Sequence, residues 1–120
     1  MSYPSASNVP VTEVVGANVR ISWEAAYSGG IGIDVQSYQI LIKDKQGNMV
    51  EDLDNCNGAN DPAITLNLEC FIPMISLVNP ETYDLDQGDL LVAQIAARNE
   101  KGQGSFSGTN IIGALIEKIP

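Results

Sequence analysis

The side chains that could carry out acid–base or nucleophilic chemistry lack the partners that such chemistry needs. The chain contains no histidine, so no imidazole can activate a hydroxyl group such as that of Ser22 or Ser37. Asp84 and Asp86 form a carboxylate pair, but two acids at this spacing are too generic to indicate a glycoside hydrolase. We therefore predict that the protein is not an enzyme and has no catalytic residue.

Two groups of aspartates raise the question of calcium, because hard cations bind several carboxylate oxygens. The groups are Asp84, Asp86 and Asp89, and separately Asp52, Asp54 and Asp61. The second group departs from the EF-hand pattern: counted from Asp52, the glycine comes one position late, Cys56 replaces an oxygen ligand and Ala63 stands where the closing glutamate belongs. We interpret all six as solvated loop carboxylates and predict no metal and no cofactor.

The chain has two cysteines, Cys56 before a loop rich in glycine and asparagine and Cys70 at the end of a predicted strand. The segment between them could fold back and bring the two thiols together. Two buried free thiols and a bridge to another molecule are the alternatives. Two cysteines without histidine cannot complete a structural zinc site.

The charge of the chain limits its partners. Six Lys and Arg residues stand against fifteen Asp and Glu residues, which gives a formal net charge of −9. Such a field repels nucleic-acid phosphates and anionic lipid head groups. The sequence also contains no run of apolar residues long enough to span a membrane. We expect neither nucleic-acid binding nor membrane insertion.

Alternation of apolar and polar residues predicts strands at 19–24, 38–43, 64–69 and 91–98. Weaker strand signals occur at 9–15, 48–53 and 111–119, and the segment 73–79 could form one short helical turn. Gly, Asn and Pro residues between these segments favour tight reversals. In 120 residues, this pattern predicts one all-β domain, a sandwich or a barrel.

The segment 97–107, ARNEKGQGSFS, fits the pattern A-x-N-x-x-G-x-G-x-x-S and resembles the sixth-strand end and following loop of fibronectin type III domains. Trp23 and Tyr38 resemble the second-strand tryptophan and third-strand tyrosine of that family, so the likeness covers residues 9–119. One position departs from it: Leu91 stands where the family usually has a tyrosine whose hydroxyl ties down a loop, so that corner must be held differently. The core signature comprises Trp23, Tyr38, Leu91, Ala97, Asn99, Gly102 and Gly104.

This resemblance implies a seven-stranded antiparallel immunoglobulin-like sandwich over residues 9–119, preceded by a linker at 1–8. Four further features resemble a divergent branch that forms tandem repeats in large surface proteins of single-celled eukaryotes. They are the stretch 56–70, which begins and ends with cysteine, Pro73 with Met74, Leu85 with residues 88–90, and the segment 110–116. The branch implies an extracellular or cell-surface location and a disulfide between Cys56 and Cys70. It also implies a noncatalytic structural or adhesion module, either a bead of a tandem-repeat protein or a fibre subunit, whose partners are proteins, including adjacent repeats or copies of itself.

In the resembled fold the third and sixth strands are neighbours, and their outward residues form an apolar strip of Leu41, Val92 and Ala96. We interpret this strip as a candidate protein contact; scattered exposed apolar residues on a monomer are the alternative. A second hypothesis is a ligand-binding module in which the loops 28–35 and 101–109 recognise a partner. Of the residues within those loops only Phe106 is aromatic, which favours a protein over a carbohydrate.

Overall fold

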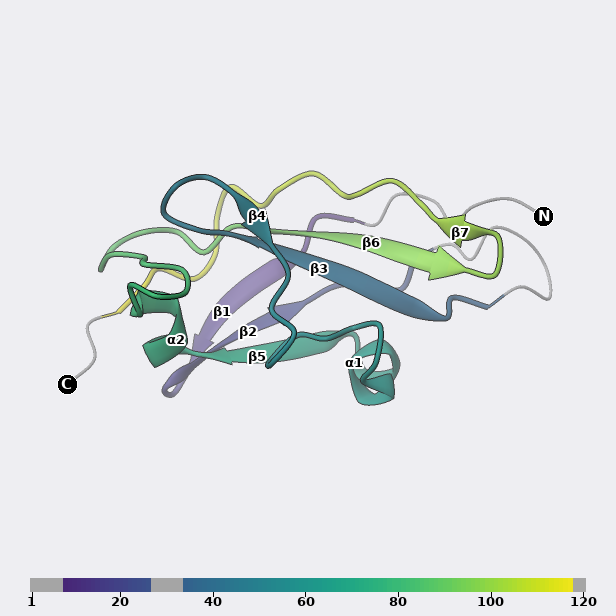
Figure 1. Ribbon diagram of the computed structural model, residues 1–120, viewed down its shortest axis with the longest axis horizontal. Helices are drawn as coiled ribbons and strands as arrows, with labels where there is room; N and C mark the ends of the chain where they lie inside the picture. The colour runs from purple at the N-terminus through teal and green to yellow at the C-terminus, as the bar shows by residue number, and fades with distance from the viewer. Residues whose placement is uncertain (1–7, 27–33, 118–120) are drawn as a thin grey trace.

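The computed structural model describes residues 8–26 and 34–117, which form two antiparallel sheets packed face to face (Figure 1). The first sheet has the order β1 (Val11–Val15), β2 (Asn18–Ser22) and β5 (Glu69–Pro73). The second has the order β4 (Met49–Val50), β3 (Ser37–Lys43), β6 (Ala93–Asn99) and β7 (Gly102–Gln103). The predicted all-β antiparallel sandwich is therefore confirmed.

The first sheet buries one face because its apolar residues alternate with polar ones. Val19 and Ile21 of β2 are fully buried, and Ile72 and Cys70 of β5 lie directly across from them. Arg20, between the two buried residues, points to the opposite face. The alternation in the sequence thus determines which side of this sheet meets the second sheet.

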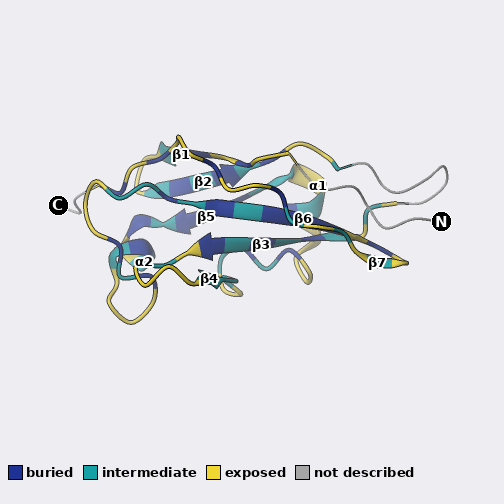
Figure 2. Ribbon diagram, turned by 90° about the horizontal axis from the view of Figure 1, so that it is seen from above, coloured by how far each residue is buried: buried dark blue, intermediate teal, exposed yellow. Residues whose placement is uncertain are grey.

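The second sheet supplies the other half of the core. Tyr38, Ile40 and Ile42 of β3 are paired with Ala97, Ile95 and Ala93 of β6, and all six are buried. Figure 2 shows buried residues alternating with more exposed ones along β3. Two of the three large side chains on β3 thus lie beside small alanines on β6, and all six point into the core.

The strand predicted at 64–69 is wrong, because residues Pro62–Asn67 form the helix α1. The side chain of Asp61 accepts a hydrogen bond from the backbone N–H of Ala63, and proline occupies the first turn, both of which favour a helix start. Leu68 ends the helix in a left-handed conformation, and β5 begins at the next residue. The alternation of apolar residues had suggested that Ile64 and Leu66 share one buried face of a strand. In the helix only Ile64 is buried, whereas Leu66 is 82% exposed.

The strand predicted at 111–119 is also largely wrong. Within its described part, up to residue 117, only Leu115 forms a β-bridge, to Leu90. The paired strand β7 instead lies within the segment predicted as a loop at 101–109. The physical reason is that side chains take the place of part of the backbone pairing along this edge of β6, which interrupts the ladder. The Ser107 hydroxyl accepts from the Ile95 N–H, and the Asn110 amide accepts from the N–H of Ala93 and donates to the carbonyl of Leu91.

The short turn predicted at 73–79 is confirmed as the helix α2 (Met74–Val78), which buries Met74 and Leu77. In the parts of the chain that the structure describes, no helix has the length and apolar character required to cross a bilayer.

Gly58 is buried and brings the segment 51–61 close to the backbone of the second sheet. A Cβ atom at Gly58 would lie 2.1 Å from the carbonyl oxygen of Tyr38. No side chain fits there unless the backbone moves.

We expect Gly58→Ala to lower the free energy of unfolding by about 2 kcal/mol or more, because the added methyl group overpacks a site bounded by backbone. The measurement is urea unfolding. Gly108→Ala is the matched control, since its Cβ would meet only a side-chain carbon of Val9 at 3.7 Å. Equal stability of the two variants would contradict this account of Gly58.

Candidate interaction face

The four strands of the second sheet contain no acidic residue, although the chain carries fifteen. Both longer strands of this sheet turn their apolar alternates inward, so their other side chains form the outer surface. We call this surface the cationic face and define it by its outward, accessible residues: Gln39, Leu41, Lys43, Val92, Gln94, Arg98 and Gln103. The side-chain amide of Gln103 donates to that of Gln39 at 3.0 Å, which ties β7 to β3 across this surface.

Lys43 and Arg98 are the charged residues of the cationic face, and both are exposed. Within the described residues, neither side chain forms an ion pair or hydrogen bond. They lie near opposite ends of the paired strands, about 20 Å apart at 3.3 Å per residue. Between them lie the half-buried side chains of Leu41 and Val92. The face therefore has an apolar centre with an unneutralised cation toward each end.

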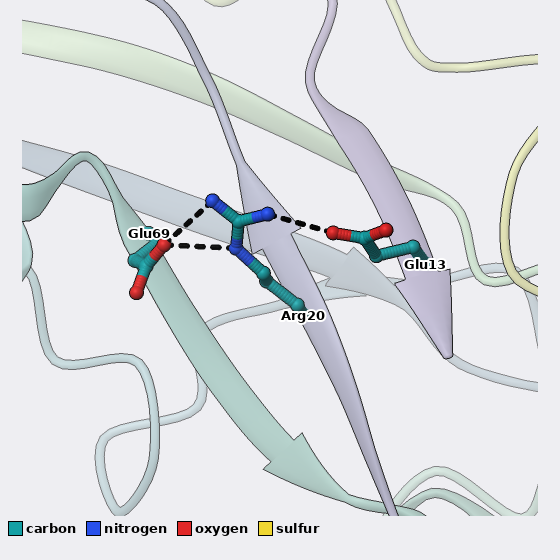
Figure 3. A network of polar contacts seen from close by, with 3 residues as sticks. All are labelled: Glu13, Arg20 and Glu69. Carbon is teal, nitrogen blue, oxygen red and sulfur yellow. Dashed lines mark hydrogen bonds and ion pairs between the residues drawn. The ribbon is translucent and has the colours of Figure 1, made fainter. Parts of the chain in front are cut away.

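The outer face of the first sheet is different, because its cation is neutralised. Arg20 forms ion pairs with Glu13 at 2.7 Å and Glu69 at 2.8 Å, one carboxylate from each neighbouring strand (Figure 3). The hydrogen bonds that Arg20 donates, first that to Glu13 and then that to Glu69, raise the pKa of Arg20. The unpaired cations Lys43 and Arg98 thus lie on the second sheet, whereas the arginine of the first sheet is already paired.

Lys45, just beyond β3, is likewise neutralised by two carboxylates. Its ammonium group lies 2.8 Å from Asp86 and 3.0 Å from Asp89. The pairs raise the pKa of Lys45, while the backbone N–H of Asp86 and then Lys45 lower the pKa of Asp89. A hollow of about 220 Å³ beside this cluster is lined by Lys43 and Val92, so it adjoins the cationic face.

The structure corrects the predicted apolar strip at one of its three positions. Leu41 and Val92 are partly exposed on the outer surface, but Ala96 is fully buried. The methyl group of Ala96 is short, Gln39 lies directly across from it, and the chain after β7 is hydrogen-bonded along the other edge of β6. Longer neighbours therefore cover Ala96, and it cannot itself contact a partner.

The core signature residues lie in the sandwich interior and at the β6–β7 turn. The rings of Trp23 and Tyr38 are 5.5 Å apart and tilted by 55°, and both are buried. The Tyr38 hydroxyl accepts a hydrogen bond from the backbone N–H of Ala26. This pair connects the end of β2 to the facing sheet, and Ala97 lies directly across from Tyr38.

Asn99 builds the turn that joins β6 to β7. Its buried side-chain oxygen accepts from the backbone N–H groups of Lys101 and Gly102. Gly102 has a φ of 146°, which a side chain would strain, and Gly104 donates to the carbonyl of Ala97 as the chain returns along β6. The motif is thus a turn that carries Arg98 and Gln103 onto the cationic face.

Leu91 is fully buried, and another tyrosine ties down the loop at that corner. The hydroxyl of Tyr83 donates to Asp52 at 2.9 Å, and its carbonyl accepts from the backbone N–H of Lys45. Burial first, and the hydrogen bond to Asp52 second, raise the pKa of Tyr83. The sequence analysis missed Tyr83 because the pairing joins residues 31 positions apart.

The cysteine pairing predicted from the resemblance is present. Cys56 and Cys70 form a disulfide with a Cα–Cα distance of 5.4 Å, and both residues are buried. The bond connects the segment after β4 to β5, so it joins an edge of the second sheet to an edge of the first. The disulfide therefore closes one side of the sandwich covalently.

The aspartates considered for calcium have other roles. Asp52 accepts from the N–H groups of Asp54 and Asn55 as well as from Tyr83, Asp61 caps α1, and Asp89 pairs with Lys45. Within residues 8–26 and 34–117, no three acidic or cysteine side chains form a group that could hold a metal ion.

Of the two loops considered for ligand recognition, residues 28–33 lie outside the described residues. The other, 101–109, is only partly a loop. Gly102–Gln103 form β7, and Gly104 and Ser107 donate backbone hydrogen bonds to Ala97 and Ile95 of β6. This segment belongs to the edge of the second sheet.

Two facing antiparallel sheets, with the strand order and Trp23–Tyr38 pair described above, define the fibronectin type III fold. The chain is similar over its whole length to the sixth fibronectin type III domain of human fibronectin type III domain containing protein 3, with 20% identity, a TM-score of 0.64 and 93% of that chain covered. No family model and no curated protein matches the sequence.

Two further solved structures are similar to it. The twitchin kinase region from C. elegans matches 96% of this chain with 19% identity and a TM-score of 0.62, and the match spans 17% of that longer chain. A structure described as a myokine matches 96% of this chain and 99% of its own, with 13% identity and a TM-score of 0.54. At these identities the likeness establishes the fold.

Tyr83 gives the stability a dependence on alkaline pH. Because its folded-state pKa is raised, the stability it contributes is present below the unfolded-state value of about 10 and is lost as the pH rises above it. We expect Tyr83→Phe to cost about 1 kcal/mol at pH 7 and to show a shallower loss of stability between about pH 10 and 12. The measurement is denaturant unfolding of the wild type and of Tyr83→Phe across this pH range. If the free energy of unfolding fell equally steeply with pH in both proteins, Tyr83 would not be the group responsible.

Loss of the disulfide should lower the free energy of unfolding by about 3 kcal/mol, because the bond restricts the unfolded chain. The comparison is between the wild type and the Cys56→Ala/Cys70→Ala variant, which leaves no free thiol. Mass spectrometry under non-reducing denaturation should show no alkylation of the wild type, and two adducts after reduction. Two adducts before reduction would contradict the bond.

Proposed function

We propose that this chain is a noncatalytic extracellular module that acts through protein–protein contacts, and that the cationic face is its contact surface. The observation that carries the proposal is the distribution of charge on that face. Lys43 and Arg98 are unpaired and exposed around an apolar centre, whereas Arg20 on the first sheet and Lys45 just beyond β3 each have two carboxylates. An apolar centre with a charged rim is the anatomy of a protein interface.

The disulfide supports the extracellular part of the proposal. Bonds of this kind persist in oxidising compartments and are rare where thiols are kept reduced. Cys56 and Cys70 are both buried and are the only cysteines of the chain, so their bond has a structural rather than a catalytic environment.

The shape supports a structural role, as a bead of a tandem-repeat surface protein or as a fibre subunit. The described C-terminal segment passes α2 at one end of the sandwich, whereas the described residues before β1 lie away from that end (Figure 1). A stiff sandwich entered and left at different ends spaces the surfaces of its neighbours and transmits force between them. Residues 9–119 would be the folded unit and residues 1–8 a linker.

Photocrosslinking in intact cells tests this proposal. A crosslinking amino acid replaces Gln94 at the centre of the cationic face, and the matched control carries it at Ser22, on the outer face of the first sheet. We expect a discrete adduct that contains a second protein chain at position 94 only, and labelling of Lys43 by a reagent that cannot cross membranes. No adduct at position 94, equal adducts at both positions, or protection of Lys43 until the cells are opened would overturn the proposal.

A further inference from the structure

We propose that the partner of the cationic face is a second copy of this chain, which inserts the acidic turn 51–54 against Leu41 and Val92. This inference rests on the proposed function and names the partner of the same face. It follows from complementary charge on two surfaces that both belong to this chain.

The turn 51–54 follows β4 and has the sequence Glu-Asp-Leu-Asp. Leu53 at its tip is 60% exposed and has an aspartate on each side. Asp52 is held by the N–H groups of Asp54 and Asn55 and by the Tyr83 hydroxyl, so the turn has a fixed shape. The turn therefore presents the apolar side chain of Leu53, which we call the knob, with a carboxylate on each side.

The cationic face has the opposite arrangement. Its centre, Leu41 and Val92, is apolar and partly exposed, and its charges, Lys43 and Arg98, are positive and unpaired. Leu53 of one copy can bury its side chain on this centre while the carboxylates beside it approach the two cations. Lys43 and Arg98 have no carboxylate partner among the described residues of their own copy. The contact would supply such partners from the second copy.

The other exposed apolar residues match the face less well. Ile111 and Ile112 are 87% and 78% exposed, yet no charged residue stands beside them in the sequence. Leu66 is 82% exposed on α1, and its immediate neighbours, Thr65 and Asn67, are uncharged. The exposed leucines among the described residues are Leu53, Leu66 and Leu115, and of these only Leu53 has a charged residue directly beside it in the sequence.

Because the face and the turn are different surfaces, the contact is heterologous, and each copy keeps one free surface of each kind. Heterologous contacts continue into rings or open filaments rather than stop at a dimer. A face of four short strands offers roughly 400 Å² per partner, about half that of a standard interface, so a single contact should be weak. Linking copies in tandem would raise its effective strength.

Sedimentation velocity at 0.15 M salt, up to about 1 mM protein, tests the inference with variants that each remove one surface. Leu41→Asp/Val92→Asp removes the face, and Leu53→Asp removes the knob. We expect the wild type to grow beyond dimers and each variant to remain monomeric, with at least tenfold weaker association. Mixed together, the two variants should form a complex of two chains that grows no further, because one intact face meets one intact knob.

Leu66→Asp, at a leucine of α1 that is even more exposed than Leu53, is the matched control and should associate as the wild type does. If the double aspartate variant unfolds, Lys43→Glu/Arg98→Glu replaces it, since both residues are exposed. A wild type that stays monomeric, association that survives Leu53→Asp, or mixed variants that do not pair would each overturn the self-partner. A crosslinked adduct with a different protein would also overturn it while leaving the proposed function intact.

Discussion

The segment between β4 and α1 holds the two sheets together at one edge, and the remaining features depend on it. Gly58 lies against the carbonyl of Tyr38 in the second sheet, while Cys56 is bonded to Cys70 in the first. Neither contact tolerates a change of register, because one is limited by backbone and the other is covalent. The segment therefore fixes the positions of β3 and β5, and it also places the turn 51–54 at the edge of the sandwich.

Much of the fold was accessible from the sequence, because alternation directly reports a half-buried strand. The strands containing Ile21, Ile40 and Ile95 are found where the pattern indicated. The pattern failed where a local signal overrode it. At Asp61 and Pro62 the capping chemistry of a helix start outweighed three alternating apolar residues. After β7, the side chains of Ser107 and Asn110 take the place of part of the backbone pairing with β6, which no hydrophobic period can reveal.

The candidate site was only partly predictable. Leu41 and Val92 follow from alternation once β3 and β6 are neighbours, but the burial of Ala96 depends on the length of the side chains around it. The charge of the face could have been found from the sequence, since the predicted strands at 38–43 and 91–98 contain no acidic residue in a chain with fifteen. The sequence does not show which cations are unpaired, because only the fold brings Arg20 and Lys45 together with their carboxylates.

A net charge of −9 and a self-complementary contact are compatible because they act over different distances. At physiological salt the repulsion between two copies is screened beyond about 8 Å, whereas charges brought together in a partly desolvated contact are screened much less. In the proposed contact, the acidic surface would keep separate copies dispersed at low salt, and the unpaired Lys43 and Arg98 would favour one orientation of approach. Charge would then select the geometry of that contact, and the apolar centre at Leu41 and Val92 would supply its strength.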